Sequence, residues 1–350
     1  ASGTSRDVLL EHLDEAVEAR IVSDQTGTGG GATPLPLGHY GFTHALIREA
    51  LYEELTGPQR VRLHRKVAEV LEATHGSAVD AHLPELAHHF FEAAPGGDVE
   101  RAIDYGVRAA EQALGQLAWE ESVAQYERVL QVEELAIPTI EGRRGELALG
   151  LAQALWRSGN YPRARETFHR VIDTARRLED GSLLARATLG MGGWPKFRAD
   201  EPPGGPADEL RALLGEALAG VEDGEVALRA RLLSQLAEQI SMEARESHSQ
   251  RAVALARESG DLDALFGALY SRLAALLGPD DIRRRLQVAT ELLDLAIRRG
   301  SKEKIFVARE SRIRSFMVLG DIAGMDREID SCHDLAEELR VPIYRHSLSR

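Results

Sequence analysis

The sequence predicts a mainly α-helical protein, with a short β-hairpin in an N-terminal domain that is followed by a solenoid of helical hairpins. Three observations predict this fold. Apolar residues recur at helical spacing along most of the 350 residues, and glycine and proline divide the chain into stretches of helix length. Strand-like segments occur only near the N-terminus. One pattern of aromatic and small residues returns after 42 residues, which is typical of a repeat array.

The predicted hairpin surrounds a glycine-rich segment, Thr26–Thr33. Its two strands are Arg20–Ser23 and His39–Thr43. Three consecutive glycines favour no regular element, so Thr26–Thr33 is expected to be a mobile tip. It lacks the Gly-Lys-Ser/Thr ending of a phosphate-binding loop, and no such motif occurs elsewhere in the chain.

Three helices accompany the hairpin. The first precedes it, the second begins at His44 with Thr43 as its cap, and the third runs from about Gln59 to Thr74. Helices with a short hairpin describe a winged-helix domain over residues 1–78. The apolar residues expected to face inward on the second and third helices are Leu46, Ile47, Ala50, Leu51, Val61, Leu63, Val67, Ala68, Val70 and Leu71.

The repeat pattern places large and small residues at offsets 0, 3, 7 and 10. The two complete copies are Trp119, Ser122, Tyr126, Val129 and Tyr161, Ala164, Phe168, Val171. A third copy follows Gly320 as Ile322, Met325, Ile329 and Cys332. The pattern resembles the tetratricopeptide repeat, in which small residues let paired helices approach and large ones fill the gap to the next pair; Gly159 turns the chain between helices.

The array is predicted to occupy the rest of the chain in three parts. Residues 79–189 form the first hairpins, 190–206 a loop or hinge, and 207–350 further hairpins. In this last part the predicted helices are 208–220, 226–242, 247–258, 262–276 and 281–298, with breaks at Gly224, Gly260 and Gly278-Pro279. Val341–His346 is expected to begin another repeat helix.

Composition excludes several classes of protein. The net charge is −14 and no segment has a basic excess, which argues against direct nucleic-acid binding. The single cysteine, Cys332, excludes internal disulfides and fits a reducing compartment. No apolar run approaches the roughly 20 residues of a membrane helix, so the sequence predicts a cytoplasmic protein.

Neither a catalytic nor a metal site is predicted. The cysteine occupies a packing position and no serine lies in a nucleophile turn, so the chain is not expected to be an enzyme. Among the histidines, His82, His88 and His89 raise the question of a metal, but His88 and His89 are expected on different helix faces. These histidines are therefore interpreted as ordinary helix residues.

Two arginine clusters lie on one amphipathic helix. These are Arg283-Arg284-Arg285 and Arg298-Arg299, between which the apolar residues Leu286, Val288, Leu292 and Leu293 are placed. A solvated helix face is the favoured interpretation. If the clusters line the concave groove of a superhelix, they favour an anionic partner.

Four segments carry a more specific resemblance. Phe42–Tyr52, Arg60–Ala68, Glu85–Phe90 and Ala102–Gly106 resemble the region after the ATPase core in large bacterial signal-transduction ATPases of the STAND class, most closely the ATP-binding LuxR-type transcriptional regulators. That family implies a nucleotide-binding core, a winged helix, a tetratricopeptide superhelix and a C-terminal helix-turn-helix. The chain then corresponds to the middle of the architecture, with no cofactor of its own and with ATP or ADP bound by the intact protein.

The resemblance also implies a role for one histidine. A winged-helix histidine in the STAND class contacts bound ADP and holds the inactive state, and His44 matches that position at the start of its helix. Ala45 stands where the eukaryotic relatives carry aspartate.

Three functions remain open at this point. The chain is interpreted first as the sensor segment of an ATP-dependent transcriptional regulator, in which an inducer or partner protein binds the superhelix. The same module attached to a cyclase or kinase effector is the second possibility, and a free-standing scaffold for protein interaction is the third. The sequence names neither the inducer nor the oligomeric state.

Overall fold

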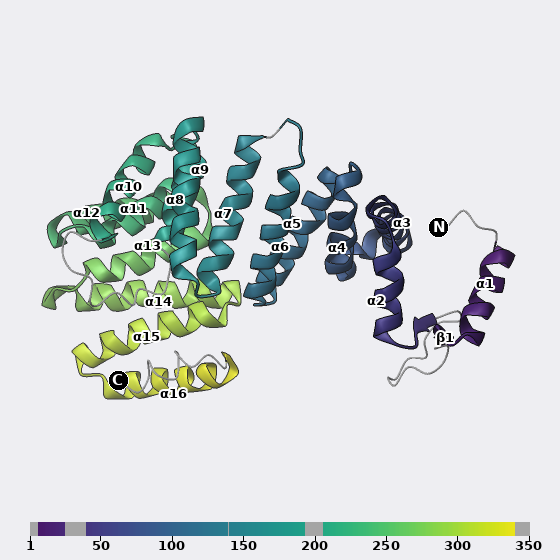
Figure 1. The fold of residues 1–350 in the computed structure, drawn as a ribbon. Helices are drawn as coiled ribbons and strands as arrows, with labels where there is room; N and C mark the ends of the chain where they lie inside the picture. Colours follow the sequence, from purple (N-terminus) through teal and green to yellow (C-terminus); the bar gives the residue numbers. More distant parts are fainter. Residues whose placement is uncertain (1–5, 25–39, 139, 193–205, 340–350) are drawn as a thin grey trace. The chain divides into compact units, whose positions relative to one another are not determined.

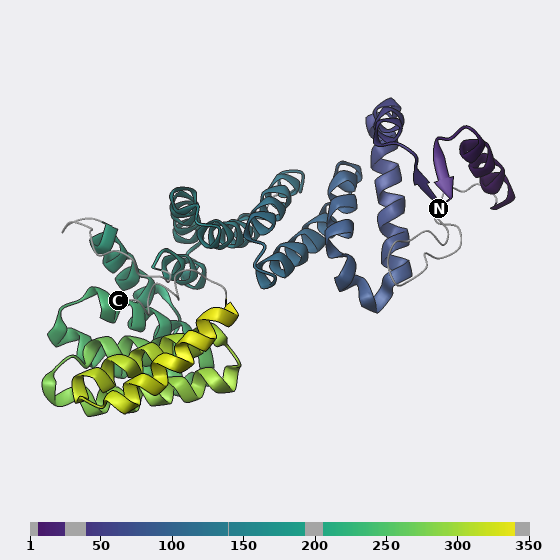
Figure 2. The same ribbon diagram turned by 90° about the horizontal axis from the view of Figure 1, so that it is seen from below.

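The computed structural model describes residues 6–24, 40–138, 140–192 and 206–339. These residues fold into two compact units, Ala1–Ala164 and Arg165–Arg350, so that the boundary lies within one helix of the repeat array. The described residues are almost entirely helical apart from a single two-stranded sheet (Figures 1 and 2). No described helix combines the length and hydropathy required to cross a bilayer.

The first unit contains the hairpin and the earlier repeat helices. Its elements are α1 (Arg6–Glu18), β1 (Val22–Asp24), β2 (Tyr40–Phe42), α2 (Ala45–Glu54), α3 (Gly57–His75), α4 (Leu83–Ala93), α5 (Val99–Gly115), α6 (Trp119–Glu133) and α7 (Glu141–Arg157), with 3-10 turns at Gly76–His82 and Ala94–Gly96. From α3 onward each helix packs on the next in the chain.

The predicted hairpin is confirmed. Strands β1 and β2 are antiparallel, with Ser23 opposite Gly41. The predicted tip, Thr26–Thr33, lies outside the described residues. Thr43 does not cap the next helix as predicted, because its hydroxyl donates to the carbonyl oxygens of Arg20 and Ile21. His44 is the cap instead, and its Nδ1 accepts from the amide of Leu46 at 3.3 Å.

The N-terminal helices bury few of the apolar residues that were predicted to face inward. No described residue before His64 is buried. Of the residues predicted to face inward, Leu46 is 65% exposed and only Ala68 is buried, while Leu51, Leu63, Val67 and Val70 remain exposed. Helix α3 turns the face that carries His64 and Ala68 toward α4, so its other apolar face is left on the surface.

The core of the first unit lies in the helices that follow. Its largest fully buried side chains include Phe90 and Leu86 of α4, and the ring of Phe90 stacks on Tyr105 of α5 with centroids 5.1 Å apart. Ala68, Leu83, Ala109, Val129 and Leu147 belong to the same cluster. Alanine dominates the contact positions, which lets neighbouring helices approach closely.

The second unit consists of further antiparallel helices. They are α8 (Tyr161–Leu178, with its last fourteen residues in this unit), α9 (Gly181–Met191), α10 (Pro206–Gly220), α11 (Val226–Gln239), α12 (Met242–Ser259), α13 (Leu262–Ala275), α14 (Ile282–Arg299), α15 (Lys302–Leu319) and α16 (Ile322–Leu339). Each of the five helices predicted between 208 and 298 is present. Gly260 and Gly300 end α12 and α14 in the left-handed conformation that glycine adopts readily.

The repeat signature occupies the packing positions in its first two copies. Ser122, Tyr126 and Val129 are buried on α6, and Ala164, Phe168 and Val171 are buried on α8. Gly159 has φ +82°, as a turn before α8 requires. The leading aromatic residues, Trp119 and Tyr161, are partly exposed.

The third copy is confirmed at Cys332 but not at Met325 and Ile329. On α16 the buried residues are Gly324, Glu328, Cys332 and Ala336, whereas Met325 and Ile329 are only partly buried. Glu328 is thus buried in place of its neighbour Ile329, which occupies the position of the aromatic ring in the other copies. It is accommodated because Arg309 and Arg312 of α15 bind its carboxylate at 2.6 and 3.0 Å. Val341–His346 lies outside the described residues.

Candidate functional site

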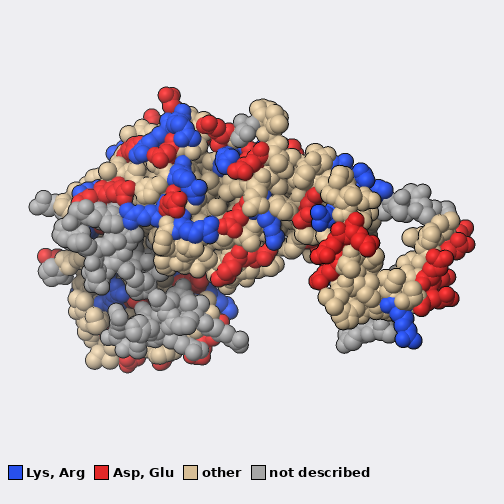
Figure 3. Space-filling view, in the orientation of Figure 1, with Lys and Arg blue, Asp and Glu red and all other residues tan. Residues whose placement is uncertain are grey.

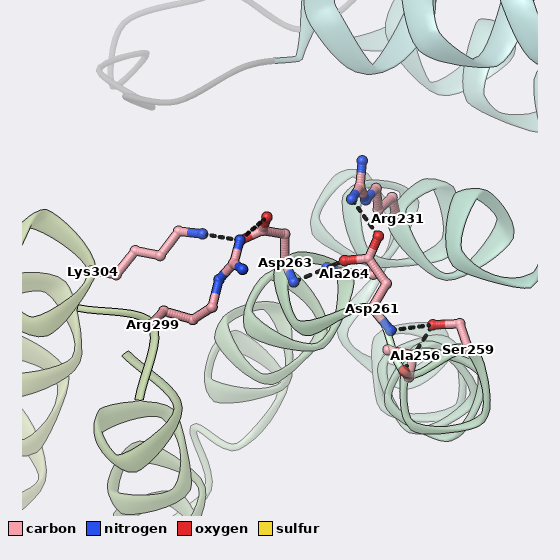
Figure 4. A network of polar contacts seen from close by, with 8 residues as sticks. All are labelled: Arg231, Ala256, Ser259, Asp261, Asp263, Ala264, Arg299 and Lys304. Atoms are coloured by element: carbon pink, nitrogen blue, oxygen red, sulfur yellow. Dashed lines mark hydrogen bonds and ion pairs between the residues drawn. The ribbon is translucent and has the colours of Figure 1, made fainter. Parts of the chain in front are cut away.

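The arginines of α14 differ in whether they form ion pairs with other residues of the fold. Arg299 donates to Asp263 at 2.6 Å, and Lys304 binds the same carboxylate. Figure 4 shows this carboxylate facing both cations, which extend from the end of α14 and the start of α15. Asp261, two residues earlier, caps α13 and pairs with Arg231 of α11 at 2.7 Å. Arg299 therefore links helices within the second unit, while its side chain is 44% exposed.

Arg284 and Arg285 are also engaged within the fold. Arg284 pairs with Asp281 at 2.9 Å and lies 3.7 Å from Glu246. Arg285 is partly buried, and burial and the neighbouring Arg314 lower its pKa. Of this cluster, Arg283 remains exposed, and no ion-pair partner for it is found among the described residues.

Arg283 lies at one end of a surface hollow of about 590 Å³. The residues that line it come from one face of α14: Arg283, Leu286, Gln287, Thr290, Glu291 and Asp294. The opposite face of this helix carries Ala289, Leu292 and Ala296, which are buried in the core. The helix is therefore buried along one side, and its other side lines the hollow.

The hollow has a positive end and a negative end, with Leu286 as its apolar lining residue. Arg283 lies about three turns before Asp294 in α14, and Leu286 and Thr290 lie between them. Glu291 is already paired with Arg257 at 2.8 Å. This arrangement does not form the purely basic groove that the two arginine clusters suggested. On the face seen in Figure 3, basic and acidic side chains are likewise interspersed over the repeat helices.

His44 is exposed at the start of α2. Because its Nδ1 accepts the amide hydrogen of Leu46, the neutral ring carries its proton on Nε2. This nitrogen is the group that could donate to a phosphate oxygen. The cap thus fixes the tautomer that the proposed nucleotide contact needs.

The histidines of the first unit are arranged differently from the prediction. His82 stacks on His75 with centroids 3.6 Å apart and lies 3.3 Å from Glu85. The side chains of His88 and His89 were expected to point to different faces of the helix. This expectation is wrong for their rings, whose centroids lie 5.2 Å apart. Both rings also contact His64 of α3, a residue that the sequence analysis had not considered.

His64 connects these side chains with Tyr52. Its Nδ1 lies 2.9 Å from Nδ1 of His89, and its Nε2 lies 2.9 Å from the Tyr52 hydroxyl. Burial lowers the pKa of His64; burial and the nearby His64 and His88 lower the pKa of His89 to about 4. Local sequence spacing gave no signal for this cluster, because His64 lies 24 residues before His88 on another helix.

Cys332 is buried within α16. Burial, opposed by Arg309 and reinforced by Glu328, raises the pKa of its thiol to about 12. A thiol in this environment stays protonated at neutral pH and is a poor nucleophile, in agreement with its predicted packing position.

Comparison with known proteins shows the fold. Neither a protein-family model nor a curated protein matches the chain. Among solved structures, a STAND protein with a tetratricopeptide repeat sensor from Pyrococcus horikoshii is similar, with a TM-score of 0.52 and 10% identity over 88% of this chain and 51% of that protein. Aspartyl phosphate phosphatase F from Bacillus subtilis is also similar, with a TM-score of 0.51 and 10% identity. The similarity covers 94% of this chain and 80% of that protein. The fold is a tetratricopeptide-like helical repeat.

The chain spans about half of the length of the P. horikoshii protein. At 10% identity these likenesses concern the fold alone.

Proposed function

We propose that this chain is the sensor segment of a bacterial signal-transduction ATPase that regulates transcription. A protein partner or small-molecule inducer binds the helical repeat, and the N-terminal segment relays binding to an ATPase core. The observation that carries the proposal is the hollow on α14, a helix held by one face and open on the other. The likeness to a protein whose repeats are described as a sensor supports it.

Residues 1–78 are proposed to act as a winged helix in the intact protein. Supporting this, the hairpin and helices α1, α2 and α3 occur in the predicted order. Their apolar residues lie on the surface and would be covered by an adjoining ATPase core; these include Val8, Leu9, Leu10, Phe42, Leu46, Leu51, Leu63, Val67 and Val70. His44, with its proton on Nε2, is proposed to donate to the phosphate of ADP.

The partner site can be tested by site-specific photo-crosslinking in cells. A benzophenone amino acid replaces Thr290 in the hollow, and a control protein carries it at the exposed position Glu258. The proposal expects one dominant adduct from Thr290 that is lacking from Glu258. Identical adduct patterns at the two positions, or none at Thr290, would contradict binding in the hollow.

The attachment to an ATPase is tested separately. The coding sequence on both sides of residues 1–350 should encode a phosphate-binding loop upstream and a helix-turn-helix downstream. A cyclase or kinase domain downstream would replace the transcriptional output with another effector. The lack of a nucleotide-binding domain would leave an interaction scaffold.

A further inference from the structure

Three imidazole rings form a nearly equilateral triangle between α3 and α4. The centroid of His64 lies 5.5 Å from that of His88 and 5.0 Å from that of His89, and the last two are 5.2 Å apart. One ligand nitrogen from each ring lies within 4.8 Å of the others. His64 is only 8% exposed, whereas His88 faces solvent.

The separations of the ring centroids match those of three imidazoles on a tetrahedral ion. With Zn–N bonds of about 2.1 Å, the ligand nitrogens lie about 3.4 Å apart and the ring centroids about 5 Å apart. His64 Nδ1 and His89 Nδ1 are already 2.9 Å apart. The His88 side chain is exposed, and a change of its rotamer would adjust the position of its nitrogen relative to the other two.

The Tyr52 hydroxyl is able to accept a hydrogen bond from the ligand form of His64. The tautomer with its proton on Nε2 donates to the Tyr52 oxygen, which lies 2.9 Å away, and leaves the Nδ1 lone pair directed toward His89. Such a hydrogen bond from the second ring nitrogen is the usual means of orienting a metal-binding histidine.

The charges around the cluster include two acids that would partly offset a dication. Glu92 acts electrostatically on His64 and Glu85 on His89, whereas Arg60 opposes a positive charge at His64. Three nitrogen ligands without a thiolate suit Zn²⁺ and similar transition metals, and they do not suit Mg²⁺ or Ca²⁺, which prefer oxygen.

We propose that His64, His88 and His89 form a binding site for a divalent transition metal of the Zn²⁺ class. The fourth coordination position would be taken by water, since the His88 side of the cluster is open to solvent. A metal held by both helices would join α3 to α4 where the N-terminal segment meets the repeats. This site is independent of the proposed sensor function.

The test is Zn²⁺ binding to the full 350-residue chain, freed of metal by a chelator and without a polyhistidine tag. Isothermal titration is expected to give one Zn²⁺ per chain. Co²⁺ in its place is expected to give the visible absorption of a tetrahedral nitrogen site. His88→Ala and His89→Ala are expected to weaken Zn²⁺ binding by at least about tenfold.

His82→Ala is the matched control, since His82 lies outside the triangle in the same histidine-rich region. It should bind Zn²⁺ as the unaltered chain does. His88→Ala removes an exposed side chain, so it keeps the test valid if substitutions of the buried His64 prevent folding. Zn²⁺ should also raise the Tm of the unaltered chain and leave that of His88→Ala unchanged.

Three results would overturn the site. They are no saturable Zn²⁺ binding in the micromolar range, binding that His88→Ala and His89→Ala leave unchanged, and an equal loss in His82→Ala. Circular dichroism of each variant establishes that the helices are intact.

Discussion

The ring of Phe168 on α8 lies directly against Gly190 on α9, in space that any β-carbon at residue 190 would enter. Tyr126 on α6 has the same relationship to Gly150 on α7, where a β-carbon would come within 2.5 Å of the ring. The two aromatic residues are 42 apart in the sequence and the two glycines are 40 apart. This aromatic-on-glycine contact therefore recurs in the array and is found in both compact units.

Gly190→Val should destabilise the second unit. The added side chain meets the fully buried Phe168 ring, so overpacking is expected to lower the free energy of unfolding by about 1–3 kcal/mol. Urea unfolding followed by circular dichroism measures this change. Gly215→Ala on the exposed face of α10 is the control, and it should stabilise by up to about 1 kcal/mol because its new methyl group meets nothing. Equal effects of the two substitutions would refute the role of the contact.

The buried carboxylate of Glu328 should be required for stability. Glu328→Ala leaves Arg309 and Arg312 without this partner inside the protein, and the expected loss is about 3–5 kcal/mol. The control is Glu338→Ala, which breaks an exposed pair with Lys302 and should cost less than about 1 kcal/mol. Thermal unfolding compares them, and a Glu328→Ala loss no larger than the control would contradict the assignment.

Asp263 should make a modest, pH-dependent contribution to stability. A hydrogen bond from Lys304 is the largest cause that lowers the pKa of Asp263, with help from Arg299 and Arg231. Its stabilisation is therefore present at neutral pH, and it is lost as the pH falls below the ordinary aspartate value near 4 and through the lowered pKa. Because the group is 40% exposed, the effect is at most about 1 kcal/mol.

The measurement is the Tm of Asp263→Asn across this pH range. The variant should unfold below the unaltered chain at pH 7, and the two should converge in acid. Asp326→Asn, which removes an exposed carboxylate from α16, should show no such trend. A difference in Tm that is constant with pH would exclude an electrostatic cause.

Cys332 should resist thiol reagents until the protein unfolds. The pKa of its buried thiol is raised to about 12, so almost no thiolate is available between pH 7 and 9. An aromatic disulfide reagent is expected to detect no thiol in the native chain and one per chain in concentrated urea, since the sequence has one cysteine. Rapid reaction of the native chain would show that α16 does not cover this residue.

The hollow on α14 should be dispensable for folding. Exchange of its terminal charges, by Arg283→Asp combined with Asp294→Arg, alters exposed side chains and should change stability by no more than about 0.5 kcal/mol. Leu292→Ala on the buried face of the same helix should cost about 2–5 kcal/mol. Calorimetry of the two proteins provides the comparison; a large loss from the charge exchange would make the hollow a structural feature.

Much of the helical architecture could be predicted because its determinants are local. The spacing of apolar residues located α10 to α14. Glycines such as Gly159 and Gly260 end helices because glycine readily adopts the positive φ angle required there. The small and aromatic residues of two repeats also identified their buried positions. In the third repeat the same argument identified Cys332 but missed Glu328, whose buried carboxylate is paired with two arginines.

The sequence by itself thus determined the helices, the hairpin and the repeat, since each depends on residues a few positions apart. Only the tertiary structure decided which faces are buried and which side chains meet. It left Leu46 and Leu63 on the surface, used Arg299 to hold Asp263, and brought His64 to His88 and His89. The physical reason is that these contacts join different helices. The rotation of each helix and its packing partner depend on which of its faces is buried most favourably in the core.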